Sequence, residues 1–413
     1  MPDRPDQRRD EVRALSRLAF EELAGGPKGI GEFHRAIAGR AFRGVSAGVG
    51  PAARPAQVLH DAIAEGVYGM LRGATGMLGR GVDAAVRQRP VAGPPLSVTP
   101  AGSVVLGALQ GLRGDALEAE GSPLTQPLAV RMHGRVVPPE HDELAAAFTG
   151  ATPRLAVFLH GLMETERAWR LGGRPTYGER LLADLACTPV EVRYNSGLHI
   201  SENGRLLAEQ LEALVAAWPV EVDEIALIGH SMGGLVARSA CFHANEDGRA
   251  WVRDVRHVIS LGTPHMGAPL EQIVHYASAA LHTLPETRPV ARFLRRRSAG
   301  IRDLRQGSLV DEDWRDRDPD TLRAAACREV PLLDGATHCF VSATVTRSPK
   351  HPVGRLVGDL LVLVPSATGR SRARRIPFRE EHGLHVGPAT HFALLNHPTV
   401  YLRIRDWLAG SPA

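Results

Sequence analysis

The chain has 413 residues, of which 44% are hydrophobic, and carries a formal net charge of +4. This length accommodates one large α/β domain with an appendage, or two domains, and the hydrophobic fraction suffices for a sizeable core. The charge is slight for such a length and the arginines are dispersed among acids, which argues against a nucleic-acid partner.

The first ten residues are charged and lack the apolar core of a signal peptide. No run of 18 uncharged apolar residues follows, so we expect no membrane-spanning segment. The cysteines lie far apart and match no zinc spacing, so a reduced cytoplasmic compartment fits them best, and we expect neither a metal nor another cofactor. They are Cys187, Cys241, Cys327 and Cys339.

Residues 1–95 are predicted to form a helical N-terminal extension. Between residues 59 and 86, apolar side chains recur every three or four positions, which is typical of a helix with one apolar face. We expect this face to pack on the main domain. A membrane-surface or oligomer contact is the alternative, and the sequence leaves the oligomeric state open.

A proline-rich linker, residues 90–100, separates this extension from a domain over residues 96–413. A helix is expected at Val104–Leu117. Two antiparallel edge strands are expected at Leu128–Met132 and Gly134–Pro138.

From Arg154 onward, apolar runs alternate with segments of helical periodicity, such as Gly204–Trp218 and Leu235–His243. This alternation predicts a mostly parallel sheet with helices on both faces, whose catalytic groups belong at the carboxyl ends of the strands. The expected strands are Leu155–Leu159, Val190–Tyr194, Ile225–Ile228, Val255–Leu261, Phe340–Ala343 and Leu360–Val364.

Ser231 is the predicted nucleophile. It stands in Gly229-His230-Ser231-Met232-Gly233, between an apolar run of strand length and a helical segment, which is the context of a nucleophile elbow. The two glycines allow the strand and the helix to approach closely at the turn. The same spacing recurs around Ser46, but neither strand nor helix flanks it, so we interpret Ser46 as a loop residue.

A His160-Gly161 turn ends the first strong strand. It could present the amide of Leu162 toward the serine, paired with the amide of Met232, because a tetrahedral intermediate needs two such donors. The alternative is an ordinary turn with a buried histidine.

The base must lie downstream of the serine if the order is serine, acid, histidine. His391 sits in a loop just before the final helical stretch and is our first candidate. His397, beside Pro398, is better placed to cap that helix, while His382 and His385 are held in reserve.

For the acid we favour Asp359, which follows Gly358 beside an expected strand. A carboxylate there could hold the imidazole and stabilise the imidazolium. It could equally be an ordinary turn residue, and Asp334 is the rival.

An insertion at about residues 270–330 is predicted to form a helical cap or lid, because it falls between the elbow helix and the acid and carries an amphipathic stripe. Whether it moves is left open. The basic clusters Arg295–Arg297 and Arg372–Arg375 could meet anionic lipid headgroups, although such runs are more often solvated, so a peripheral membrane contact also stays open.

Three segments together resemble lipases and esterases of the α/β-hydrolase superfamily, in particular the GPI inositol-deacylase-like (PGAP1-like) and triacylglycerol lipase families. They are Gly229–Arg238, Gly262–Pro269 and His391–Pro398. The resemblance implies an α/β-hydrolase fold with a helical extension and cap. It also implies roles for Ser231 as nucleophile, Asp359 as acid, His391 as base, Leu162 and Met232 as oxyanion amides, and His160, Gly161, His230, Thr263 and Pro264 as residues around the substrate, with His265 structural.

The sequence thus predicts a metal-independent serine esterase or lipase acting on lipid-like or medium-chain acyl esters. An acyltransferase would use the same residues, with an alcohol or thiol replacing water. A non-catalytic interaction protein on the same fold is the alternative from another class.

Overall fold

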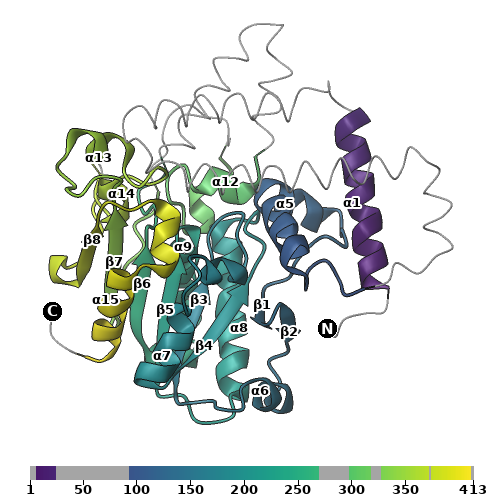
Figure 1. Cartoon of the computed structure of the whole chain (residues 1–413), viewed down its shortest axis with the longest axis horizontal. Coiled ribbons are helices and arrows are strands. Elements are labelled where there is room, and N and C mark those ends of the chain that lie inside the picture. The colour runs from purple at the N-terminus through teal and green to yellow at the C-terminus, as the bar shows by residue number, and fades with distance from the viewer. Residues whose placement is uncertain (1–5, 25–92, 269–296, 318–326, 372–373, 411–413) are drawn as a thin grey trace, which may run out of the picture.

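The computed structural model describes residues 6–24, 93–268, 297–317, 327–371 and 374–410 (Figure 1). Across these ranges, no helix combines the length and the apolarity needed to cross a bilayer. Ser46 and the periodic stretch at 59–86 lie outside the described residues, as do most of the cluster Arg295–Arg297 and half of Arg372–Arg375.

Eight strands form one sheet in the order β2-β1-β4-β3-β5-β6-β7-β8. Strands β3 to β8 are mutually parallel, whereas β1 pairs antiparallel with both β2 and β4. The mostly parallel sheet, flanked by helices, confirms the α/β-hydrolase fold class expected from the sequence. The strands are β1 (Ala129–Met132), β2 (Arg135–Val137), β3 (Arg154–Leu159), β4 (Cys187–Arg193), β5 (Glu224–His230), β6 (Val255–Leu261), β7 (Thr337–Ala343) and β8 (Gly383–Val386).

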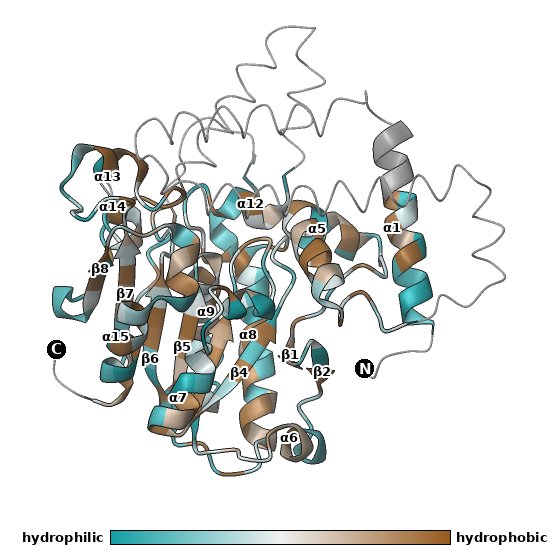
Figure 2. Cartoon of the chain, viewed as in Figure 1, coloured by the Kyte–Doolittle hydropathy of each residue, from teal (hydrophilic) through white to brown (hydrophobic). Residues whose placement is uncertain are grey.

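Helices cover both faces of the sheet. Leu155, Val157 and Leu159 of β3 share one hydrophobic cluster with α8 and α9, while Ala156 and Phe158 share another with α7 and α15. Because alternate side chains of a strand point to opposite faces, a strand buried on both faces must be apolar throughout, and Figure 2 shows the central strands coloured as hydrophobic. The α-helices are α1 (Gln7–Ala24), α5 (Pro100–Ala119), α6 (His141–Ala147), α7 (Tyr177–Leu185), α8 (Ile200–Ala217), α9 (Met232–Glu246), α12 (Ala299–Asp303), α13 (Pro352–Val357), α14 (Val364–Ala367) and α15 (Pro398–Leu408). The 3-10 helices are η2 (Glu166–Arg170), η3 (Ala250–Asp254), η5 (Asp311–Asp313), η6 (Glu380–His382) and η7 (His391–Asn396).

Most of the predicted elements are confirmed, including the edge hairpin, but the strand expected at Leu360–Val364 is wrong. Gly358 and Leu360 adopt positive φ angles of 58° and 91°, which extended strands do not contain. The chain turns here, and Val364 begins α14. The last strand is instead β8, which carries His385 and was not expected from the sequence.

The N-terminal extension is described only in part. Within it, Leu15 and Leu18 of α1 pack against Leu106 and Leu109 of α5 in a separate apolar cluster. Of the expected cap, residues 297–317 and 327–330 are described. The amide of Ala299, at the start of α12, donates to Asp115 over 2.9 Å. The domain boundary at residue 95 and the extent of the cap stay predictions.

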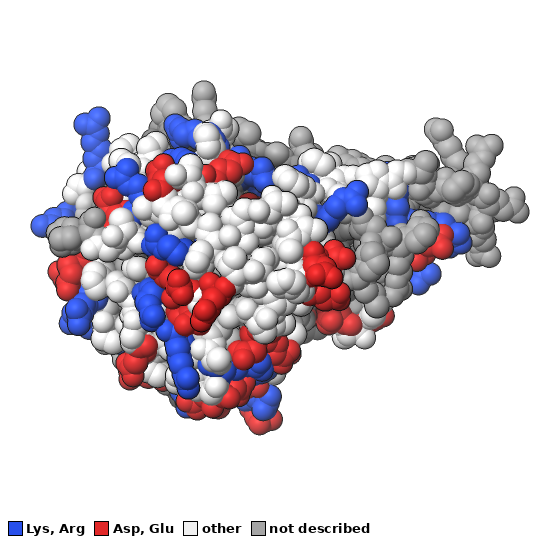
Figure 3. All heavy atoms as spheres, turned by 90° about the horizontal axis from the view of Figure 1, so that it is seen from below, with Lys and Arg blue, Asp and Glu red and all other residues white. Residues whose placement is uncertain are grey.

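Charged side chains of both signs are interspersed on the face seen in Figure 3. This distribution agrees with the dispersal of arginines among acids in the sequence. Three of the four cysteines are buried, Cys327 is half-buried, and all four are free thiols.

Candidate active site

Ser231 stands at a sharp turn between β5 and α9. Its φ and ψ are 52° and −120°, a conformation that non-glycine residues rarely adopt. Its amide donates to the carbonyl of Leu261, the last residue of β6, over 2.8 Å, which anchors the turn. A Cβ at Gly229 would lie 2.3 Å from the amide nitrogen of Gly234, and one at Gly233 would lie 2.3 Å from the carbonyl oxygen of Leu159. The turn therefore requires both glycines, as the sequence predicts.

His391 and Asp359 are joined by two hydrogen bonds. The Nδ1 atom of His391 lies 2.8 Å from Oδ2 of Asp359, and the His391 amide donates to the Asp359 carbonyl over 2.9 Å. The other carboxylate oxygen, Oδ1, accepts the amides of Leu361 and Val362 at 3.0 and 2.8 Å. With three donors on a side chain only 1% exposed, the carboxylate is fixed to hold the Nδ1–H tautomer of the imidazole.

This arrangement leaves the Nε2 atom of His391 available. Nε2 is buried and has no hydrogen-bond partner among the described residues, the Ser231 hydroxyl included. The ring lies at the carboxyl end of β6, because a Cβ at Gly262 would come within 3.1 Å of its Cε1 atom. Burial lowers the pKa of His391, but the Asp359 carboxylate and its hydrogen bond outweigh that effect and the net shift is upward.

The rival acids and bases have other partners or are exposed. His397 caps α15, where its Nδ1 accepts the amide of Thr399. His385 lies in β8 with Ser342 and Thr344 at 3.1 Å from its two ring nitrogens. His382 ends η6, and Asp334 is exposed in a turn before β7. His391 differs from His382, His385 and His397 in having, within the described residues, a carboxylate at hydrogen-bond distance.

The turn after β3 lies against Ser231. A Cβ at Gly161 would be 3.1 Å from the Cβ atom of Ser231. The main-chain amides of Leu162, in this turn, and of Met232, the first residue of α9, have no acceptor within the described ranges. Helix α9 also directs its positive end toward this point. Their assignment as oxyanion donors stays a prediction.

Four residues expected around the substrate are buried against protein atoms. His160 is fully buried and stacks on Tyr194 at a ring-centroid distance of 4.2 Å. Thr263 faces α9, since its Oγ1 lies 2.1 Å from the Cβ position of Gly234. His230 is fully buried, with partners near both ring nitrogens, and Pro264 is buried at the end of β6. The assignment of these residues to substrate contact stays a prediction.

Sequence reasoning missed Glu164, which lies three residues beyond Gly161. Its Oε2 accepts the Gly161 amide over 2.6 Å and lies 3.1 Å from Nδ1 of His230. Burial raises the pKa of the Glu164 carboxyl, but His230 and the Gly161 amide lower it by more. The net shift is downward, so the group favours its ionised form. The available signal was a carboxylate in the turn after a buried strand, but its partner is 66 residues away in the chain.

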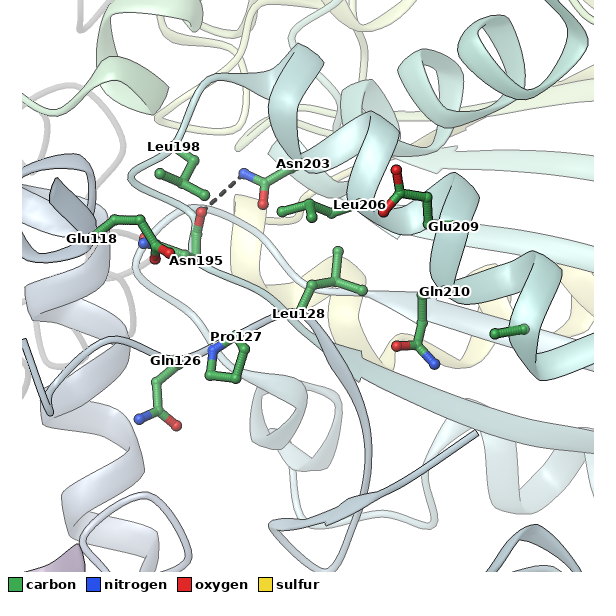
Figure 4. Close-up of a pocket in the computed structure, with 11 residues that line it drawn as sticks. Glu118, Gln126, Pro127, Leu128, Asn195, Leu198, Asn203, Leu206, Glu209 and Gln210 are labelled. Carbon is green, nitrogen blue, oxygen red and sulfur yellow. Dashed lines mark hydrogen bonds between the residues drawn. The ribbon is translucent and has the colours of Figure 1, made fainter. Parts of the chain in front are cut away.

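A pocket of about 330 Å³ opens elsewhere, between α8 and the segment before β1 (Figure 4). Leu128, Leu198 and Leu206 line it, beside Asn203, which donates to the Asn195 carbonyl over 2.9 Å. Neither Ser231 nor any other predicted site residue lines this pocket, so it is separate from the candidate active site.

The family model of the PGAP1-like alpha/beta domain matches residues 196–314. This match confirms, for that part of the chain, the resemblance that the motifs suggested. No curated protein matches the chain.

Among solved structures, the chain is similar to the Bacillus licheniformis lipase BlEst2. The propeptide form is 18% identical with a TM-score of 0.41, covering 62% of this chain and 51% of the lipase chain, so the chain spans about half of that lipase's length. The mature form is 18% identical with a TM-score of 0.37, over 63% of this chain and 92% of the other. The RedJ thioesterase of Streptomyces coelicolor is also 18% identical, with a TM-score of 0.34, over 63% and 91% of the two chains.

Proposed function

We propose that the protein is a serine carboxylic-ester hydrolase that acts on lipid-like or medium-chain acyl esters. The observation that carries the proposal is the buried His391–Asp359 hydrogen bond of 2.8 Å, which leaves Nε2 of His391 without a partner among the described residues. The strained turn that carries Ser231 supports it. A serine hydroxyl is a poor nucleophile at neutral pH, and an adjacent base oriented by a carboxylate is what activates it.

In the proposed mechanism, the Ser231 oxygen attacks the ester carbonyl while Nε2 of His391 takes the hydroxyl proton. The amides of Leu162 and Met232 donate to the resulting oxyanion. The intermediate collapses, the imidazolium gives its proton to the departing alcohol, and an acyl-enzyme remains. Water then attacks the acyl-enzyme by the same steps, releasing the carboxylic acid and restoring the serine.

The imidazolium that forms in each half-reaction needs a counter-charge. Asp359 is only 1% exposed and accepts its two main-chain donors on one oxygen, so the other oxygen is directed at His391. Its charge is therefore weakly screened and acts mainly on the imidazole. The lipid-like substrate class rests on the resemblance to lipase families.

Labelling with a fluorophosphonate probe tests the proposal, because the probe reacts with activated serines. We expect the wild type and Ser46→Ala to be labelled and Ser231→Ala to be unlabelled. Esters of graded chain length, with and without an added alcohol, then separate hydrolysis from acyl transfer. A wild type that stays unlabelled in buffer and in detergent would contradict the proposal and favour a non-catalytic role.

A further inference from the structure

Glu164 and His230 form a buried pair beside Ser231. The Glu164 side chain is 10% exposed and that of His230 is 0% exposed, and Oε2 lies 3.1 Å from Nδ1. The same oxygen accepts the amide of Gly161 over 2.6 Å. The carboxylate therefore stabilises the turn that follows β3 by a hydrogen bond within that turn.

Both ring nitrogens of His230 face acceptors. Nδ1 faces the Glu164 carboxylate, and Nε2 lies 3.3 Å from the main-chain carbonyl of His391. The ring therefore lies between an acceptor on the turn after β3 and an acceptor on the loop that carries His391.

His160 shows the contrasting case in the same core. Its Nδ1 faces the carbonyl of Gly161 at 2.8 Å, while its Nε2 accepts the amide of Tyr194 at 3.3 Å. One donor and one acceptor suit the neutral ring, and burial lowers the pKa of His160 to about 4. The two buried histidines therefore differ in their partners, because His160 meets one donor and one acceptor whereas His230 meets two acceptors.

The pair connects three loops that the proposed reaction needs. Glu164 holds the turn that carries the Leu162 amide, His230 directly precedes Ser231, and its ring contacts the main chain of His391. We propose that Glu164 and His230 are positioning residues, which fix the oxyanion turn and the base loop relative to Ser231. This inference rests on the proposed esterase function.

The position of the turn has a consequence for catalysis. The Leu162 amide, which this turn carries, would donate to the negative charge that develops on the substrate oxygen. A displaced turn should therefore cost more in the transition state than in the ground state. Loss of the pair should lower kcat while leaving KM nearly unchanged.

The test compares Glu164→Gln, His230→Gln and the double variant on a soluble ester, with active sites counted by fluorophosphonate titration. Glutamine can still accept the Gly161 amide but carries no charge. We expect kcat per active site to fall roughly tenfold or more in each single variant, with KM within about twofold of the wild type. The double variant should be no slower than the slower single variant, because the two residues act as one unit.

Glu179→Gln is the matched control. The Glu179 carboxylate accepts the amide of Thr176, three residues earlier, over 2.7 Å, just as Glu164 accepts the amide of Gly161. This contact lies at the start of α7. We expect the kcat of this variant to equal that of the wild type. Counting active sites removes any contribution from unfolded protein, so a purely structural role would leave kcat per site unchanged.

Four results would overturn the inference. If kcat per site in Glu164→Gln stays within about twofold of the wild type, or the losses simply add, the pair does not position the site, although the esterase proposal stands. If KM rises while kcat holds, Glu164 binds substrate instead. A wild type that is neither labelled nor active would overturn the inference together with the proposed function.

Discussion

Replacing Asp359 by asparagine changes the charge at the centre of the candidate site while keeping its shape. In the wild type, Oδ1 accepts the amides of Leu361 and Val362 at 3.0 and 2.8 Å, and Oδ2 accepts from His391 at 2.8 Å. An asparagine can keep the two main-chain bonds with its single oxygen. Its NH₂ group, which is a donor, then faces the Nδ1–H group of His391, which is also a donor.

The imidazole can adapt only by moving its proton from Nδ1 to Nε2. In that tautomer His391 cannot take the proton of Ser231, so the base is lost although every side chain remains in place. We expect kcat to fall by roughly 10⁴-fold, which corresponds to about 5 kcal/mol of transition-state stabilisation.

The assay is the steady-state hydrolysis of a chromogenic ester, with thermal unfolding of each variant as a check on folding. Asp334→Asn is the matched control, because Asp334 is the exposed rival acid. Activity in Asp359→Asn within tenfold of the wild type would refute the reasoning, as would a loss confined to Asp334→Asn.

Three other outcomes follow from the geometry. The pKa of His391 is raised above its ordinary value of 6.5, and the imidazole can act as a base only when it is neutral. We therefore expect kcat/KM to rise with pH through a midpoint above 6.5, and a midpoint below 6.5 would contradict the assignment of His391 as the base. Gly233→Ala places a Cβ 2.3 Å from the last main-chain oxygen of β3, so it should lower the free energy of unfolding in urea by about 3 kcal/mol or more. Gly150→Ala, with open space around it, should leave this free energy unchanged, and equal effects of the two variants would refute the close approach. Glu166→Ala leaves Arg193, which is 1% exposed and paired with Glu166 at 2.6 Å, without its counter-charge, and should cost about 3–5 kcal/mol; a loss below about 1 kcal/mol would show that the buried pair adds little.

The elements that carry Ser231 could be predicted from the sequence because their signals are local. The apolar run of β5, the glycines of the turn and the helical periodicity of α9 are all read from neighbours along the chain. The same holds for the edge hairpin and for most strands of the parallel sheet. Asp359 and His391 could be proposed from their loops, but with rivals left open.

The strand at Leu360–Val364 was predicted wrongly because an apolar run can also fill a turn. Here Oδ1 of Asp359 accepts the amides of Leu361 and Val362, and Gly358 and Leu360 take positive φ angles, so the run cannot extend. Strand β8 was missed for the opposite reason. It has only four residues, and it is defined by its pairing with β7.

The local pattern of the chain therefore determined the fold class, most of the strands and the turn that carries Ser231, the proposed nucleophile. Only the tertiary structure selected Asp359 as the partner of His391, placed His160 and Thr263 in the core, and paired Glu164 with a histidine 66 residues away. Those pairings depend on which side chains the folded sheet brings together. Sequence spacing carries no direct record of such contacts, because residues that meet at the end of a parallel sheet come from different crossovers.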